Sequence, residues 1–322
     1  MYRAKQLSVG VAVYVPEDDE HRPERLAYLT DLRSAVDDDQ LVLHFQPRLD
    51  LATGRRTAVE ALVRWQHPTE GLLPPARFIP LAEPTGLMEP LTRRVLALAL
   101  AQARHWRDQG RDLPVAVNIS ASVLHDTDLV GTVLEALHGA GLPPSALELE
   151  VTESAMMSSP ASAIRVAHAL EAAGVRLSVD DFGTGHSSLA YLRDLPVSQL
   201  KIDRSFLRNV PEDARGVSIV RSVIELGHHL GLRVVGEGIE TLESLALLTE
   251  LGCGRGPGLP PGSTRSRRVP ALIPGGVTRN GGGVGTDVHA CSRARWQRTR
   301  PARLRRCRSR LGGCGQAGRE PT

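Results

Sequence analysis

The sequence contains few aromatic residues and no long apolar run. Phe, Trp and Tyr together make up 3% of its 322 residues, whereas all apolar residues make up 41%. This fraction suffices for one large α/β domain or two ordinary ones, with cores built mainly from aliphatic side chains. No stretch approaches the roughly eighteen apolar residues of a transmembrane helix, and no basic segment precedes a short apolar one. We therefore expect a cytoplasmic chain that makes no membrane contact.

Cysteine and lysine are also scarce. The four cysteines show neither zinc-site nor paired-thiol spacing, which argues against a disulfide framework and against a thiolate metal site. Lys5 and Lys201 are the only lysines in a chain that otherwise uses arginine. A compact ammonium can hold a phosphate oxygen or a metal-bound hydroxide in a way that planar guanidinium replaces poorly, which makes Lys201 a candidate functional residue.

The net charge of +3 conceals an uneven distribution along the chain. Residues 1–253 hold 24 basic and 34 acidic side chains, whereas Gly254–Thr322 holds fifteen arginines and two acids. A basic arm of this kind is typical of nucleic-acid binding. Its single aromatic residue, Trp296, offers little surface for base stacking, so we expect no specific nucleic-acid partner.

Short β-branched runs alternate with longer amphipathic stretches from Leu41 to Gly252. This alternation predicts an α/β fold with a parallel sheet, either a closed barrel or a doubly wound layer. Two helical stretches, Leu91–Gly110 and Arg215–Gly231, each end in the glycine that often closes a helix. The predicted strands are Leu41–Pro47, Ala58–Trp65, Val115–Ser120, Ala146–Ser154, Arg176–Gly183, Gln199–Arg204 and Arg233–Glu240.

Polar side chains gather at the carboxyl ends of these strands. In a (β/α)8 barrel all strand carboxyl ends open onto one face, whereas a doubly wound sheet brings only two or three together at its switch point. The pattern therefore favours a TIM-like (β/α)8 barrel. The residues concerned are Glu60, Asn118, Glu150, Glu153, Asp180, Asp181, Lys201 and Glu237.

Carboxylates with an asparagine and no histidine form an oxygen-rich set that suits Mg²⁺ or Mn²⁺. Asp180 and Asp181 are adjacent at a strand end, where one carboxylate can bridge two ions about 4 Å apart, as in phosphodiester cleavage. Each residue alone has a simpler explanation. The Asp pair can cap a helix, Glu150 can be a solvated strand end, Asn118 a turn former and Lys201 a surface charge. Their equivalent places in successive βα units favour the shared site.

Seven short motifs of the sequence resemble those of EAL domains. They occur in the family's order between about Leu41 and Cys253, and together they are highly specific to it. The motifs are Phe45-Gln46-Pro47, Glu60-Ala61-Leu62-Val63-Arg64-Trp65, Val117-Asn118-Ile119-Ser120, Glu148-Leu149-Glu150-Val151-Thr152-Glu153-Ser154, Asp180-Asp181-Phe182-Gly183-Thr184-Gly185, Leu200-Lys201-Ile202-Asp203-Arg204 and Glu237-Gly238-Ile239-Glu240-Thr241.

The resemblance implies a phosphodiesterase that hydrolyses cyclic di-GMP to linear pGpG with two Mg²⁺ or Mn²⁺ ions, in bacterial second-messenger signalling. It implies that the first ion is held by Glu60, Asn118, Glu150 and Asp180, and the second by Asp180 and Asp181. Lys201 and Glu237 are the implied residues that orient and activate the attacking water.

The resemblance also implies substrate contacts from Gln46, Arg64 and the backbone of Leu62. Glu153 is expected to brace the Asp181–Leu189 loop, which helps to order the second ion and a homodimer contact. His186 stands where the family more often has an aromatic residue, a departure that we expect the activity to survive.

The resemblance divides the chain into four parts. Residues 1–20 resemble the C-terminal end of a GGDEF (diguanylate cyclase) domain without its catalytic segments, so we expect no cyclase activity. Residues 21–40 are the expected linker helix, and residues 41–253 the EAL phosphodiesterase domain. Residues 254–322 are expected to be a disordered tail rich in Arg, Gly and Pro.

The tail also departs from the family's pattern. After Cys253 the family has Asp-x-Ala-Gln-Gly-Tyr followed by strand eight and helix eight, whereas this chain reads Gly254-Arg255-Gly256-Pro257-Gly258-Leu259-Pro260. Read one base further on, codons for these residues permit Asp, Glu or Ala, Ala, Gln, Gly, Tyr and Leu. We therefore expect that a frameshift has removed strand eight, helix eight and a substrate-binding Gln.

The expected loss leaves two functions open. The complete ligand set favours an active phosphodiesterase. The missing strand would leave unpaired sheet edges that promote aggregation, and it favours an impaired, EAL-like module that binds cyclic di-GMP or another protein without hydrolysis.

Overall fold

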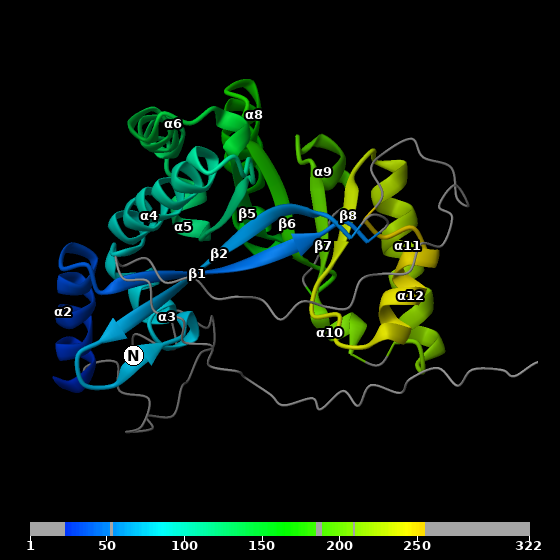
Figure 1. Ribbon diagram of the computed structural model, residues 1–322, viewed down its shortest axis with the longest axis horizontal. Helices are drawn as coiled ribbons and strands as arrows, with labels where there is room; N and C mark the ends of the chain where they lie inside the picture. The colour runs from blue at the N-terminus through cyan, green and yellow to red at the C-terminus, as the bar shows by residue number, and fades with distance from the viewer. Residues whose placement is uncertain (1–22, 52–53, 185–188, 209, 255–322) are drawn as a thin grey trace, which may run out of the picture. The chain divides into compact units, whose positions relative to one another are not determined.

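The computed structural model describes residues 23–51, 54–184, 189–208 and 210–254, and Figure 1 shows their arrangement. All of them belong to one of the two compact units of the chain, residues 1–282. Helix α2 (Pro23–Asp37) falls within the expected linker. The predicted GGDEF remnant, His186 and the predicted tail beyond Gly254 lie outside the described residues.

The described strands form one curled sheet in the order β1-β2-β4-β5-β6-β7-β8, with the short β3 paired to β2. All neighbours from β2 to β8 along this order are parallel. Each of the seven predicted strands is present, so the predicted α/β class is confirmed. The strands are β1 (Leu41–Leu49), β2 (Arg56–His67), β3 (Gly71–Leu73), β4 (Val115–Ile119), β5 (Leu147–Thr152), β6 (Arg176–Phe182), β7 (Gln199–Ile202) and β8 (Arg233–Gly236).

The prediction that the sheet is parallel throughout was wrong for its first strand. β1 and β2 are antiparallel neighbours, with Phe45 opposite Ala61 and Gln46 opposite Glu60. The connection between them is too short for the crossover helix that a parallel pair needs. Because β1 runs the opposite way, its C-terminal residue Leu49 lies at the amino end of the parallel strands.

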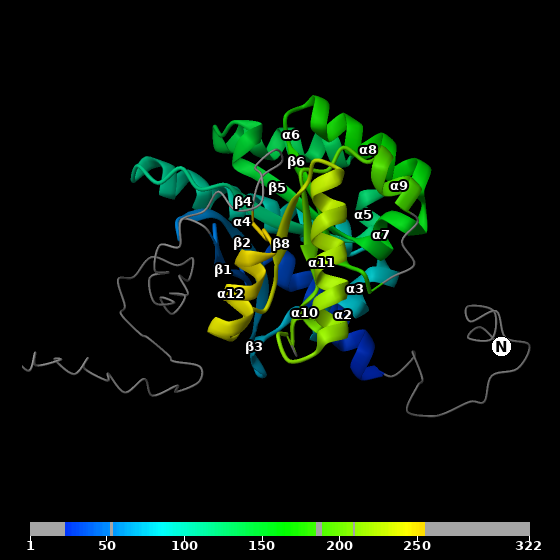
Figure 2. The same ribbon diagram turned by 90° about the vertical axis from the view of Figure 1, so that its right-hand side faces the viewer.

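Helices pack along the strands, as Figures 1 and 2 show. Helix α4 contacts β1 and β4, α8 contacts β6, and α11 contacts β7 and β8. None of the helices in the described part combines the length and apolar character that crossing a bilayer requires. The helices are α3 (Ile79–Ala82), α4 (Met88–Asp108), α5 (Ala121–Leu124), α6 (Leu129–Ala140), α7 (Glu153–Ser158), α8 (Pro160–Ala172), α9 (Leu189–Asp194), α10 (Arg204–Leu207), α11 (Ala214–His229) and α12 (Leu242–Glu250), with 3₁₀ turns at Pro75–Arg77, Glu83–Thr85 and Pro144–Ala146.

The two predicted glycine stops lie just beyond their helices. Gly110 follows the end of α4 with φ 76°, and Gly231 follows that of α11 with φ 75°. This left-handed conformation is open to glycine at little steric cost, and it lets the chain turn back toward the next strand.

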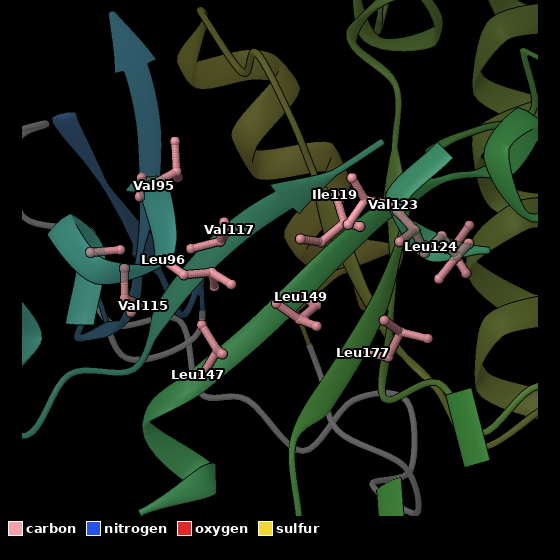
Figure 3. Close-up of a cluster of buried hydrophobic side chains, with 14 of the residues drawn as sticks. Val95, Leu96, Val115, Val117, Ile119, Val123, Leu124, Leu147, Leu149 and Leu177 are labelled. Atoms are coloured by element: carbon pink, nitrogen blue, oxygen red, sulfur yellow. The ribbon is translucent and has the colours of Figure 1, made fainter. Parts of the chain in front are cut away.

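Strand β5 shows why the sheet carries a charged site. Side chains alternate between the two faces of a strand. Leu147, Leu149 and Val151 of β5 belong to the aliphatic core, whereas Glu148 and Glu150 point to the opposite face. Figure 3 shows part of this core, in which the labelled side chains are Val95, Leu96, Val115, Val117, Ile119, Val123, Leu124, Leu147, Leu149 and Leu177. Along β5, the inner face of the curl is therefore left to polar residues.

The curl does not close within the described residues. Strand β8 corresponds to the seventh predicted strand, because β3 was not predicted. No pairing of the described residues joins β8 to β1. On the outer side of β8, the Gly254 N–H donates to Val234 O at 2.7 Å and the Cys253 thiol to the same oxygen at 3.4 Å. The described chain thus stops where it begins to pair with β8, and the predicted incomplete TIM-like barrel is confirmed for this part of the protein.

Candidate active site

Lys201 on β7 lies at the centre of a group of carboxylates inside the curl. Its Nζ donates to Glu150 Oε2 at 2.8 Å and to Asp180 Oδ2 at 3.0 Å. The same nitrogen is 3.5 Å from Glu60 Oε2 and 2.5 Å from Glu237 Oε1. The lysine side chain is only 1% exposed. The structure thus brings together candidate residues from β2, β5, β6, β7 and the segment after β8.

Four carboxylates around one ammonium leave a surplus of negative charge. Burial disfavours the charged form of Lys201, but Glu60, Asp180 and Glu237 outweigh it and raise the pKa of Lys201 above its ordinary value. Burial also raises the pKa of Glu237; Lys201 opposes this shift, and Asp180 and Glu60 add to it. Lys201 therefore remains protonated at neutral pH, and the raised pKa of Glu237 means that this carboxylate binds a proton more readily than usual.

Asp181 continues the site from the end of β6 with a strained backbone. Its φ of 53° lies in the left-handed region that residues with a Cβ rarely adopt, a feature typical of functional sites. Its N–H donates to Asp180 Oδ1 at 2.9 Å. Burial, followed by the charge of Asp180, raises the pKa of Asp181. The turn places the carboxylates of Asp180 and Asp181 in the same cluster of acidic side chains.

The donor set fits a hard divalent cation. Asp180, Asp181 and Glu237 each offer an oxygen, and these oxygens all lie within 4.8 Å of one another. Carboxylate oxygens are the ligands that Mg²⁺ and Mn²⁺ prefer. Among the described residues, the cluster of Asp180, Asp181 and Glu237 is therefore a candidate metal site.

Glu60 lies in the middle of β2 rather than at its end, because β2 continues to His67 beside β1 and β3. Asn118 of β4 donates its Nδ2 to Glu60 Oε1 at 3.1 Å. This bond orients Asn118 so that its side-chain oxygen is left for another partner. Glu60 belongs to the carboxylates around Lys201, and Asn118 lies beside them.

The predicted substrate contacts lie along the same strands. Gln46 is exposed on β1 directly opposite Glu60, and opposite residues of antiparallel strands project to the same face. Leu62 and Arg64 follow Glu60 at alternate positions of β2 and therefore share its face. Arg64 Nη1 donates to Val63 O at 2.8 Å.

Glu153 joins the end of β5 to the segment after β6. It is buried at the start of α7, and its Oε2 accepts the Gly183 N–H at 2.7 Å. Gly183 has φ 97°, and an added Cβ there would lie 3.0 Å from the ring of Phe206. The contact holds the backbone just beyond Asp181, while part of the expected Asp181–Leu189 loop lies outside the described residues.

Sequence reasoning missed a second layer of polar residues inside the curl. Glu148 and Gln199 precede Glu150 and Lys201 by two positions on the same strands. Arg48 reaches the two glutamates from β1. The alternation of side chains in β5 and β7 was the available signal for the first two. Arg48 could not be found without knowing that β1 is antiparallel.

Comparison with known proteins agrees with these features. Residues 29–259 match the family profile described as the EAL domain. The chain is 44% identical over 255 residues to the bifunctional diguanylate cyclase/cyclic di-GMP phosphodiesterase MucR of Pseudomonas aeruginosa, covering 79% of this chain and 37% of that protein. It is 49% identical over 224 residues to the cyclic di-GMP phosphodiesterase NbdA of the same organism, covering 69% and 29%.

A solved structure is also similar. The MucR phosphodiesterase in complex with cyclic di-GMP matches with a TM-score of 0.68 and 46% identity, over 70% of this chain and 92% of that one. The chain spans about a third of the length of the two curated relatives named above.

Proposed function

Because the chain belongs to the EAL domain family, we propose that it is a phosphodiesterase that hydrolyses cyclic di-GMP to linear pGpG. The observation that carries the proposal is the group of carboxylates around Lys201, on the inner face of a curled parallel sheet. Relatives that share this part of the chain are named as cyclic di-GMP phosphodiesterases.

The proposed cofactors are two Mg²⁺ or Mn²⁺ ions. Glu60, Asn118, Glu150 and Asp180 would hold the first, and Asp180 with Asp181 the second. When bound, the ions would supply the activation of water and the stabilisation of the leaving oxygen that phosphodiester cleavage requires. The oxygen-rich donors and the surplus of negative charge support this assignment.

Lys201 and Glu237 have different proposed tasks. The raised pKa of Lys201 keeps its ammonium charged, so Nζ can hold a negative oxygen but cannot accept a proton at neutral pH. The raised pKa of Glu237 suits a carboxylate that takes a proton from the attacking water. The 2.5 Å contact between Nζ and Oε1 lets Lys201 orient the base.

Substrate binding is proposed for the segment of β1 and β2 beside the acidic group. Gln46 can hydrogen-bond a guanine edge, and Arg64 can pair with a phosphate. The backbone of Leu62 lies between Glu60 and Arg64 on the same strand, where it can contact the ligand. The proposed homodimer would form through this same domain.

A second candidate function is cyclic di-GMP binding without hydrolysis. The observation that favours it is the position of Glu237, which follows β8, a strand whose described pairing beyond β7 is limited to Cys253 and Gly254. The metal ligands on β2, β5 and β6 do not share this weakness. A chain with intact ligands and a poorly placed Glu237 would bind the nucleotide and release it unchanged.

Incubation of the full chain with cyclic di-GMP tests both candidates. We expect pGpG with Mn²⁺ and none with EDTA, measured by anion-exchange chromatography. Nucleotide binding without pGpG, measured by calorimetry in Mn²⁺, would select the second function. The absence of both binding and product would contradict the proposal.

A further inference from the structure

Arg48, Glu148 and Gln199 form a layer beneath the proposed metal ligands, in which Glu148 and Gln199 are buried and Arg48 is largely covered. Arg48 Nη1 donates to Glu148 Oε1 at 2.8 Å, and Gln199 Nε2 donates to Glu148 Oε2 at 2.8 Å. The other end of the guanidinium, Nη2, forms an ion pair with Glu150 Oε1. Arg48 therefore connects two glutamates that lie two positions apart on β5.

Glu150 is held at both of its oxygens by different cations. Oε1 pairs with Arg48 and Oε2 accepts a hydrogen bond from Lys201. The side chain is fully buried, where an unpaired carboxylate carries a large desolvation cost. The fork of Arg48 can contact two carboxylates at a fixed separation, which a lysine ammonium cannot reproduce.

We propose that Arg48, itself held by Glu148, is a positioning residue that turns Glu150 Oε1 away from the site, so that Glu150 offers a divalent cation only Oε2, through the lone pair that Lys201 does not use. The inference rests on the proposed function, in which Glu150 is a metal ligand. A carboxylate restricted to one oxygen suits the octahedral coordination of Mg²⁺, whereas Ca²⁺ also accepts both oxygens of one carboxylate. Arg48 thus favours Mg²⁺ and Mn²⁺ over Ca²⁺.

Simple electrostatics makes the opposite prediction for removal of the charge. A cation near a metal site repels the metal, so its loss would tighten binding. Arg48→Lys separates the two effects, because it keeps the charge and loses the fork. Arg176→Lys is the matched control: Arg176 lines the same cavity, but its Nη2 donates to Ser145 O at 2.9 Å and it does not hold Glu150.

The experiment titrates Mn²⁺, followed by electron paramagnetic resonance, and Ca²⁺ in competition, into the full chain and both variants. We expect Arg48→Lys to weaken Mn²⁺ binding by about 10- to 100-fold, as for other residues that orient a metal ligand. The loss for Ca²⁺ is expected to be smaller, because the freed Glu150 can bind it with two oxygens. Arg176→Lys is expected to change neither affinity.

Two results would overturn the inference alone: unchanged Mn²⁺ affinity in Arg48→Lys, or equal losses for Mn²⁺ and Ca²⁺, which would indicate general loosening. If circular dichroism shows that Arg48→Lys does not fold, Glu148→Gln takes its place. We expect Glu148→Gln to weaken Mn²⁺ binding in the same direction but by less. An unchanged Mn²⁺ affinity in that variant would overturn the inference. A wild-type chain that binds no Mn²⁺ would overturn the proposed function, and the inference with it.

Discussion

The middle of the sheet and its last strand differ in how they support the candidate site. Glu150, Asp180 and Lys201 lie on β5, β6 and β7, each of which is paired on both sides. Glu237 follows β8, whose described pairing beyond β7 is limited to Cys253 and Gly254. Within the described residues, the proposed metal ligands Glu150 and Asp180 therefore lie on strands paired on both sides, whereas the proposed base Glu237 follows a strand that is less completely paired. A set of site residues can thus be complete in the sequence while the strands that position them differ in how fully they are paired.

The largest expected effect concerns Glu237 itself. Glu237→Gln removes the proposed base, so turnover of cyclic di-GMP is expected to fall by about 10²- to 10⁴-fold. Glu240→Gln, an exposed residue three positions further along the same segment, serves as the control. If Glu237→Gln keeps full turnover in a Mn²⁺-dependent assay, Glu237 is not the base. The difference between β8 and the middle strands would then have no consequence for catalysis.

Cys253 reports on how firmly the outer side of β8 is held. Burial raises the pKa of its thiol to about 12, and only the thiolate reacts with alkylating reagents. Relative to the unfolded chain, its alkylation near neutral pH is expected to be about a thousandfold slower if the outer side of β8 stays closed. Mass spectrometry of the Cys253 peptide separates it from the other cysteines. A rate close to that of the unfolded chain would show that this side of β8 opens frequently.

Lys201→Met tests the part of the site on the strands that are paired on both sides. Without the ammonium, four carboxylates face one another, and the free energy of unfolding is expected to fall by about 3–5 kcal/mol in EDTA. Mn²⁺ is expected to recover most of this loss, because it neutralises the same carboxylates. Urea unfolding measures both conditions, with the exposed Arg193→Met as the control for loss of a surface cation. Equal destabilisation with and without Mn²⁺ would contradict the proposed metal site.

The smallest effect is on pH dependence. The raised pKa values of Asp181 and Glu237 mean that protons compete with metal at a higher pH than for ordinary carboxyls. Mn²⁺ affinity is therefore expected to fall as pH falls through these raised values, by up to about tenfold per pH unit for each proton displaced. For the metal-free protein, the free energy of unfolding depends on pH in the opposite sense. Because the folded-state pKa values of Asp181 and Glu237 are raised, the stability that these groups contribute is lost as pH rises through the same range. An Mn²⁺ affinity that stays constant down to the ordinary carboxyl range would count against both shifts.

Much of this arrangement could be predicted from the sequence. β-branched runs separated by amphipathic stretches gave all seven strands, and glycines marked the ends of α4 and α11. The carboxylates that surround Lys201 were found from their places at successive strands. These features are local or periodic, so one sequence carries enough information to identify them.

Other features depend on tertiary geometry. The direction of β1 is decided by the short connection to β2 and by pairing, and it determines where Arg48 points. Glu60 lies in the middle of β2 because β2 extends further to pair with β3, and this pairing was not predicted from the sequence. The assigned roles of the site residues, the domain division and the frameshift remain predictions.

The most direct test compares this chain with the product of a gene from which one base is removed after the codon for Cys253. Turnover of cyclic di-GMP at saturating Mn²⁺ is the quantity to measure in both proteins, together with their Mn²⁺ affinity. The uneven support of the site predicts similar Mn²⁺ affinity and much faster turnover in the restored protein. Equal turnover in the two proteins would contradict it, because the pairing of β8 would then have no bearing on Glu237.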